Sequence, residues 1–246
     1  MSLELIYPNW PAPPGVRAIS STRIGGVSVA PYDSLNLGAH VGDLPEAVAE
    51  NRRRLVAQAA LPREPAWLDQ VHGVRVLRLD ADTPQGETAD ACWTGSAGVP
   101  CAVMTADCLP VLFCSRDGRH VAAAHAGWRG LVSGVLEATL AALPVPSGEL
   151  LAWLGPAIGP AAFEVGEEVR AAFAAAAAED AVHFTPDGER WLADLFGLAR
   201  ARLRRGGVGA VYGGGLCTHA QPSRFFSHRR DGRSGRMASL IWRAAE

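Results

Sequence analysis

Short apolar runs bounded by glycine, proline and polar residues recur along the whole chain and predict β-strands. Runs such as CAVMT and PVLFC would be apolar on both faces of a strand, which is typical of a sheet covered on both sides. The predicted strands span residues 16–21, 74–79, 101–105, 111–114, 120–125, 150–154, 208–212 and 238–242.

Apolar residues that repeat every three to four positions predict four helices between these strands. The first starts near Asp43, with Pro45 and Glu46 in its opening turn, and runs to Leu55. The others are expected at 130–143, from 164 to about 179, and at 191–205. Mixed strands and helices over one core indicate an α/β (α+β) layered fold. Because no linker divides the chain, residues 1–246 are expected to form a single catalytic domain.

Composition narrows the function classes. The chain of 246 residues is 48% hydrophobic and 20% charged, which is typical of a soluble globular protein. Its net charge of -2 argues against a nucleic-acid partner or a basic membrane-surface protein. No apolar stretch approaches the ~20 residues of a membrane span, and the N-terminus does not resemble a signal peptide. We therefore expect a cytoplasmic protein with no membrane partner.

The basic residues and the cysteines exclude several catalytic mechanisms and structural sites. All 23 basic residues are arginine, which excludes Schiff-base catalysis and the lysine-dependent P-loop. The cysteines are odd in number, so they are expected to be thiols rather than a disulfide framework. No CxxC pair occurs, so a cysteine-rich structural zinc site is not expected.

Three segments place a histidine or cysteine at a predicted strand end beside glycine or proline: DQVHG, TADCLP and HAGWRG. Functional sites are commonly built at such positions. Together His72, Cys108 and His125 form a two-histidine, one-cysteine set, which suits a catalytic zinc site with an open position or a copper site. Turn histidines and a buried core cysteine would give the same residues without a metal, and the wide spacing leaves both interpretations open.

Glycine and arginine offer candidate ligand contacts. TRIGGVS, LGPAIGP and VYGGGLC could let the backbone approach a ligand, although none fits a dinucleotide-binding pattern. The planar forks of Arg23 and Arg129, in glycine-containing turns, suit phosphate or carboxylate. The arginine-rich segment 224–236 is interpreted chiefly as a solvated loop, with Arg229 as a substrate-binding candidate. Asp107, beside Cys108, is a candidate acid or a partner that orients a ligand.

The motifs together resemble the laccase-domain family, whose members are also named multicopper polyphenol oxidase-like or purine nucleoside phosphorylase-like. The resemblance covers nearly the whole chain and rests on motifs in the family's order: STRIGGVS, SLNLGAHVGD, DQVHG, ADACWT, TADCLP, HAGWRG, GPAIGP and RRDGRSGRMASLIW. It implies a four-layer α/β/β/α domain, with two mixed sheets packed together and helices outside. It maps the family's metal triad, usually described with zinc, onto His72, Cys108 and His125. Asn36, within SLNLGAHVGD, is a further expected substrate contact.

The resemblance implies phosphorolysis of adenosine, inosine, guanosine and methylthioadenosine, with adenosine deamination. The older name of copper-dependent polyphenol oxidase fits poorly, because seven histidines without an HxH pair supply one metal site rather than several. We hypothesise a zinc-dependent purine nucleoside phosphorylase that is a monomer or homodimer. The runner-up is a cysteine or metal amidase that edits peptidoglycan precursors, with Cys108 activated by His125 or His72. His219 and His228 stand where family members often have tyrosine, at the pocket rim.

Overall fold

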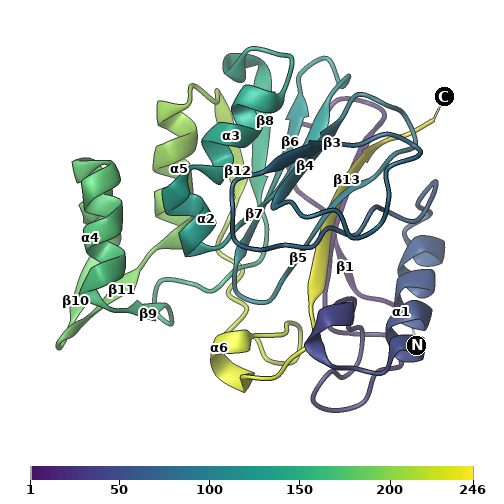
Figure 1. Ribbon diagram of the computed structural model, residues 1–246, viewed down its shortest axis with the longest axis horizontal. Helices are drawn as coiled ribbons and strands as arrows, with labels where there is room; N and C mark the ends of the chain where they lie inside the picture. The colour runs from purple at the N-terminus through teal and green to yellow at the C-terminus, as the bar shows by residue number, and fades with distance from the viewer. Residues whose placement is uncertain (1, 246) are drawn as a thin grey trace.

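Two β-sheets packed face to face form the centre of the computed structural model, which describes residues 2–245 (Figure 1). The antiparallel four-stranded sheet has the order β1 (Leu5–Ile6), β2 (Val16–Ser21), β13 (Met237–Arg243) and β5 (Cys101–Thr105). The six-stranded sheet has the order β12 (Ala210–Gly213), β8 (Leu150–Leu154), β6 (Leu109–Ser115), β7 (Val121–Ala126), β4 (Ala91–Thr94) and β3 (Val76–Arg78). Its two outer pairs are parallel and its inner pairs are antiparallel.

Helices cover the outer faces of both sheets (Figure 1). One side carries α1 (Pro45–Gln58), and the other carries α2 (Trp128–Ser133), α3 (Val135–Ala142), α4 (Glu167–Ala176) and α5 (Leu195–Arg205). The short α6 (His228–Asp231) lies at one end of the sheets. The 3-10 helices are η1 (Ala39–Val41), η2 (Ser147–Glu149) and η3 (Ala178–His183). The expected α/β/β/α layering is confirmed.

Alternation along the strands explains the layers. In β5, Cys101 and Val103 face the core between the two sheets, whereas Ala102 and Met104 pack on the α1 side. In β6, Leu112 and Cys114 face the core between the sheets, and the intervening Phe113 packs on the helical side. All these side chains are buried, so both faces of each strand must be apolar. This is the physical reason for the uninterrupted apolar runs in the sequence.

Three predicted helices have different boundaries in the structure. The helix expected at 130–143 is divided at Gly134, which adopts φ 98° and separates α2 from α3. The segments expected to start helices at 164 and 191 begin instead as β9 (Glu164–Val165) and β11 (Arg190–Ala193). With β10 (Phe184–Asp187) these strands form a third, antiparallel sheet that the periodicity did not predict. Asp194 then caps α5 by accepting a hydrogen bond from the backbone N–H of Gly197.

No helix in residues 2–245 is long and apolar enough to cross a membrane.

Candidate metal and active site

The connection from β5 to β6 carries Cys108 from one sheet to the other. It spans only the residues between Thr105 and Leu109, and Asp107 adopts φ 86°, a conformation rare for residues with a side chain. The buried Asp107 carboxylate accepts hydrogen bonds from Thr218 Oγ1, Ser227 Oγ and the Arg229 N–H. These contacts hold the strained turn, and they place Cys108 at the shared end of the two sheets.

Two histidines converge on this cysteine. His125 lies in β7, and His72 precedes β3 in a loop where it adopts φ 61°. The Cys108 Sγ lies 3.7 Å from His72 Nε2, and the two imidazole ring centroids are 4.8 Å apart. One ligand atom from each of the three residues lies within 4.8 Å of the others. The structure therefore brings together three residues that are separated by 36 and 17 positions in sequence.

Asp90 positions both histidines. One of its carboxylate oxygens accepts hydrogen bonds from the His72 N–H at 2.9 Å and from His125 Nδ1 at 2.8 Å. The other accepts from the backbone N–H groups of Val71 and Gly73. Because Nδ1 of His125 carries this bond, its Nε2 is left to face the cysteine. A carboxylate that orients an imidazole in this way is the usual support of a metal-binding histidine.

Gly127 leaves the space in which the three side chains meet. A Cβ at this position would lie 2.7 Å from His72 Cδ2 and 2.9 Å from Cys108 Sγ. No larger residue fits without moving these groups, which is why HAGWRG carries glycine here.

The electrostatics favour a thiolate at Cys108. Burial raises the pKa of the Cys108 thiol, but the charge and hydrogen bonds of His125 and His72 outweigh it and lower the pKa to about 6. Burial lowers the pKa of His125, but the Cys108 thiolate and the Asp90 carboxylate raise it to about 9. Without a metal, Cys108 and His125 therefore form a thiolate–imidazolium pair near neutral pH.

This pair predicts a reactive thiol in the metal-free protein. Cys108 should be alkylated by iodoacetamide with a rate that rises through a midpoint near pH 6, because the thiolate is the nucleophile. Cys114 is the matched control, since burial raises its pKa to about 12. Peptide mass spectrometry at a series of pH values measures both rates. A midpoint above pH 8 for Cys108 would contradict the proposed pairing with His125.

A cavity of about 320 Å³ opens onto the three residues, a volume suited to a small molecule. Among residues 2–245 no carboxylate lines it, whereas two arginines and several histidines do. Its lining comprises His40, Gln70, His72, Met104, Thr105, Ala106, Cys108, His125, Arg129, His228 and Arg236. Apart from the Cys108 thiolate, the charged side chains of the lining are therefore cationic.

Only one of the predicted substrate-binding residues lines this cavity. It is Arg129, which is exposed and lies 4.5 Å from the Trp128 ring centroid. Arg23 bonds to the carbonyls of Asp33 and Pro222 and pairs with the Asp33 carboxylate. Its contacts are thus with neighbouring loops, and its substrate-binding role stays a prediction.

Asn36 and Arg229 also lie outside the cavity lining. The buried Asn36 accepts hydrogen bonds from the backbone N–H groups of Gly38 and Arg236, so it anchors the chain at Arg236. The Arg229 guanidinium donates to the Glu164 carbonyl. Direct substrate contact by either residue stays a prediction.

Asp107 stays a candidate catalytic residue, but its carboxylate is occupied by its three donors and does not line the cavity. These contacts favour its orienting role. His219 and His228, which stand where family members often have tyrosine, lie at different cavities. His228 lines this cavity, whereas His219 lines another.

Sequence reasoning missed several residues that shape the site. Asp90 and Gly127 lie within ADACWT and HAGWRG, and His40 and Arg236 lie within SLNLGAHVGD and RRDGRSGRMASLIW. The motifs marked these segments, but neither spacing nor residue type showed which side chains face the cavity.

The donor set fits a metal ion. Two imidazoles and a thiolate match the ligands that zinc and copper accept, and three protein ligands beside an open cavity leave a position for a substrate or water. The triad could hold such an ion, and its identity is not fixed by the donor set.

Residues 17–244 match the family model described as "Multi-copper polyphenol oxidoreductase laccase". The chain is 57% identical over 239 residues to "Purine nucleoside phosphorylase YfiH" of Escherichia coli, covering 97% of this chain and 98% of that protein. It is 60% identical over 239 residues to "Purine nucleoside phosphorylase PA4543" of Pseudomonas aeruginosa, covering 96% and 97%.

Solved structures show the same architecture. The Neisseria meningitidis protein NMB0706 superposes with a TM-score of 0.94 at 52% identity, covering 98% of this chain and 99% of that one. YlmD from Geobacillus stearothermophilus gives a TM-score of 0.86 at 30% identity, covering 96% and 94%. Because the family model matches residues 17–244 and these relatives are covered over nearly their whole length, the chain belongs to the multi-copper polyphenol oxidoreductase laccase family.

Proposed function

We propose that the chain is a zinc-dependent purine nucleoside phosphorylase. The observation that carries the proposal is the convergence of His72, Cys108 and His125 at a cavity with cationic walls. Phosphorolysis needs such a site, because an anionic nucleophile must be held against C1′ of the ribose. The names of the relatives from Escherichia coli and Pseudomonas aeruginosa support the same reaction. Adenosine, inosine, guanosine and methylthioadenosine are the proposed substrates.

Arg236 and Arg129 are proposed to bind phosphate. The Arg236 guanidinium uses Nη1 for the Ser234 and Gly235 carbonyls and leaves Nε and Nη2 without a hydrogen-bond partner within residues 2–245. Arg129 is exposed at the same cavity. A planar fork that keeps free N–H groups suits bidentate contact with phosphate oxygens.

The remaining steps are assigned to the chain's own residues. A phosphate oxygen attacks C1′ while the bond from C1′ to the purine nitrogen breaks, and its electron pair leaves with the base. His228, which lines the cavity, is proposed to supply the proton that the departing base takes up. Bound at His72, Cys108 and His125, zinc would supply Lewis-acid polarisation of an oxygen or a nucleophilic hydroxide, which extends the proposal to adenosine deamination.

Phosphate-dependent release of hypoxanthine from inosine tests this function. Protein of measured zinc content should release the base only when phosphate is present, and should form ribose 1-phosphate in equal amount. Removing zinc with a chelator should abolish the turnover, and adding zinc back should restore it. Absence of phosphate-dependent release by the zinc-loaded protein would overturn the proposal.

The phosphate-binding role proposed for Arg129 gives a separate prediction. Arg129→Ala should raise the KM for phosphate by about 10–100-fold with a smaller change in the KM for inosine, because a charge-assisted contact is worth roughly 1.5–3 kcal/mol. Steady-state kinetics with each substrate varied in turn measures both constants. Arg53→Ala is the matched control, because the Arg53 side chain is exposed on the surface of α1, and it should leave both KM values unchanged. Equal changes in the two KM values for Arg129→Ala would contradict a phosphate-specific role.

A cysteine amidase acting on cell-wall precursor peptides is the second candidate, and the Cys108–His125 pair favours it. The lowered pKa of Cys108 supplies a thiolate, and Asp90 orients the histidine. Metal dependence separates the candidates, since a thiol amidase should keep its activity in chelator. Copper-dependent oxidation of polyphenols is less well supported, because residues 2–245 offer a single His/Cys cluster for a metal.

A further inference from the structure

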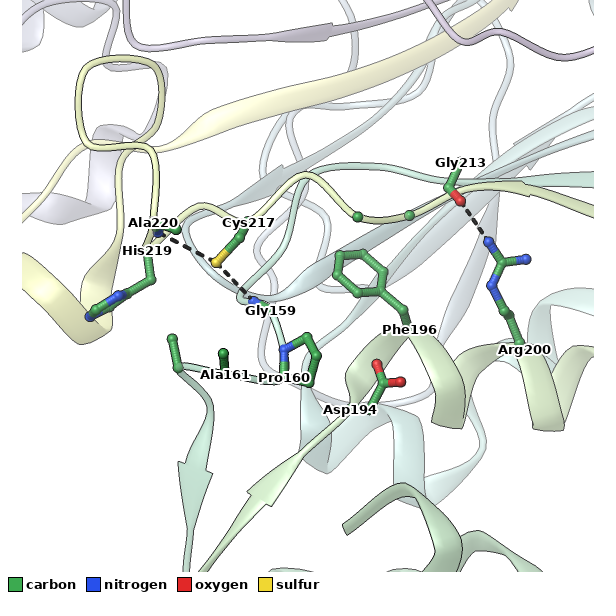
Figure 2. A pocket seen from close by; sticks show the side chains of 13 residues that line it. Gly159, Pro160, Ala161, Asp194, Phe196, Arg200, Gly213, Cys217, His219 and Ala220 are labelled. Atoms are coloured by element: carbon green, nitrogen blue, oxygen red, sulfur yellow. Dashed lines mark hydrogen bonds between the residues drawn. The ribbon is translucent and has the colours of Figure 1, made fainter. Parts of the chain in front are cut away.

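A second cavity, of about 590 Å³, lies apart from the metal site and shares no lining residue with it. Its walls come from residues 159–162 after β8, from 213–220 at and after the end of β12, and from the start of α5 (Figure 2). The first two segments belong to the glycine-rich motifs LGPAIGP and VYGGGLC, which the proposed function does not use. The volume lies in the range of small-molecule sites.

The middle of this cavity is formed by bare glycine backbone and the Phe196 ring, beside the Arg200 guanidinium, which donates a hydrogen bond to the Gly213 carbonyl. Gly213, Gly214 and Gly215 adopt φ values of 70°, 80° and 97°, so the chain runs past without side chains. A Cβ at Gly214 would lie 3.4 Å from the Phe196 ring, whereas one at Gly215 would meet nothing within 4 Å. Bare backbone and the ring face of Phe196 offer the kind of surface on which a planar aromatic molecule packs.

Polar groups mark the two ends of this surface. Asp194 uses Oδ1 to cap α5, and its Oδ2 has no hydrogen-bond or ion-pair partner within residues 2–245. At the other end the half-buried Cys217 Sγ accepts hydrogen bonds from the N–H groups of Gly159 and Ala220, at 3.2 and 3.4 Å. Figure 2 shows the Asp194 carboxylate beside Phe196, with Cys217 and His219 further along the wall.

We propose that this cavity binds a planar heteroaromatic amine, the chemical class that includes the amino-bearing nucleobases. The ring packs against Phe196 and the Gly213–Gly215 backbone. The amino group donates to Asp194 Oδ2, which is a charge-assisted hydrogen bond. The ligand lies along the wall toward Cys217, so its presence shields the sulfur from solvent reagents.

Protection of Cys217 tests the proposal, with adenine as the probe. Adenine at about ten times its dissociation constant or more should slow alkylation of Cys217 by iodoacetamide at least about tenfold, because the bound ring covers the sulfur. Hypoxanthine is the matched probe, because it keeps the ring system and replaces the amino group with a carbonyl, and it should protect much less. The Cys108 peptide, followed in the same samples by mass spectrometry, reports the metal site separately.

The outcomes separate this inference from the proposed function. Protection of Cys108 alone, or equal protection of Cys217 by both bases, overturns the inference and leaves phosphorolysis standing. Protection of Cys217 by adenine in a protein that releases no hypoxanthine from inosine supports the inference and overturns the phosphorolysis.

Titration calorimetry decides the case if Cys217 reacts too slowly with iodoacetamide to be followed. Asp194→Asn keeps an oxygen to cap α5 but replaces the free carboxylate oxygen with an amide NH₂. One adenine-binding event seen with the wild type should weaken at least about tenfold in the variant. Identical isotherms for the two proteins would overturn the proposal.

Discussion

Cys108→Ala is expected to lower kcat/KM for inosine phosphorolysis by about a thousandfold or more, and to reduce the bound zinc at least about tenfold. The sulfur is the one thiolate of the triad, and the two histidines that remain are a weak chelating pair. The variant leaves the backbone of the β5–β6 turn intact, since Asp107 holds that turn through its own carboxylate. Hypoxanthine release and metal analysis on the same preparation measure both losses.

Cys114→Ala is the matched control for this loss. Cys108 directly precedes β6, and Cys114 lies near the end of the same strand. Cys114 is buried, but it faces the core between the two sheets and does not line the active-site cavity. Its removal should cost about 1 kcal/mol of stability and leave turnover and zinc content intact. If Cys108→Ala kept wild-type turnover, the triad would not be the reaction centre. Wild-type turnover in fully metal-free protein would instead favour Cys108 as a nucleophile.

A sheet covered on both sides could be predicted from the apolar runs in the sequence, whereas the four layers were an expectation from the family resemblance. Strands covered on both faces are buried at every position, as β5 and β6 are, and their residues are apolar up to the terminal Thr105 and Ser115. The small third sheet, by contrast, could not be predicted from the pattern of apolar residues. The segment that starts at Glu164 carries apolar residues at helical spacing, yet its first two residues pair with β11, and Trp191 and Leu192 do the same from the other side. Strands this short cannot show a period, so tertiary pairing overrode the local pattern.

The metal triad could be proposed from residue types and motifs, and Asp107 as a residue that orients a ligand, whereas the roles of Asp90 and Gly127 could not. His72 and Asp107 take positive φ values, and nothing in a sequence marks a strained residue that has a side chain. Asp90 lies 35 residues before His125, and only the pairing of β4 with β7 brings the two together. Arg23 and Arg129 look alike in sequence because both lie near glycine. Their different surroundings, carbonyl groups for Arg23 and an open cavity for Arg129, depend on the fold.

Asp90→Ala is expected to lower the free energy of unfolding by about 3–5 kcal/mol and to weaken metal binding by about 10–100-fold. The variant leaves the N–H groups of Val71, His72 and Gly73 and the Nδ1 of His125 without their acceptor. Without these hydrogen bonds the backbone at His72 can also relax from its positive φ, which moves the His72 imidazole away from Cys108 and His125. Calorimetric melting temperatures and zinc titration of the metal-free protein measure the two effects.

The pH dependence separates this role from mere packing. Burial raises the pKa of Asp90, but the His125 hydrogen bond and the backbone N–H groups outweigh it and hold the pKa below its usual value. A carboxyl whose pKa is lower in the folded state than in the unfolded state stabilises the fold at pH values above its unfolded pKa. This stability is lost as the pH falls through the pKa of the folded state. The wild type should therefore lose stability in acid more steeply than Asp90→Ala, while the exposed control Asp82→Ala should follow the wild type. Parallel curves for wild type and Asp90→Ala would show that the carboxylate charge does not hold the histidines, and the site would then rest on packing at Gly127 and on the Asp107 turn.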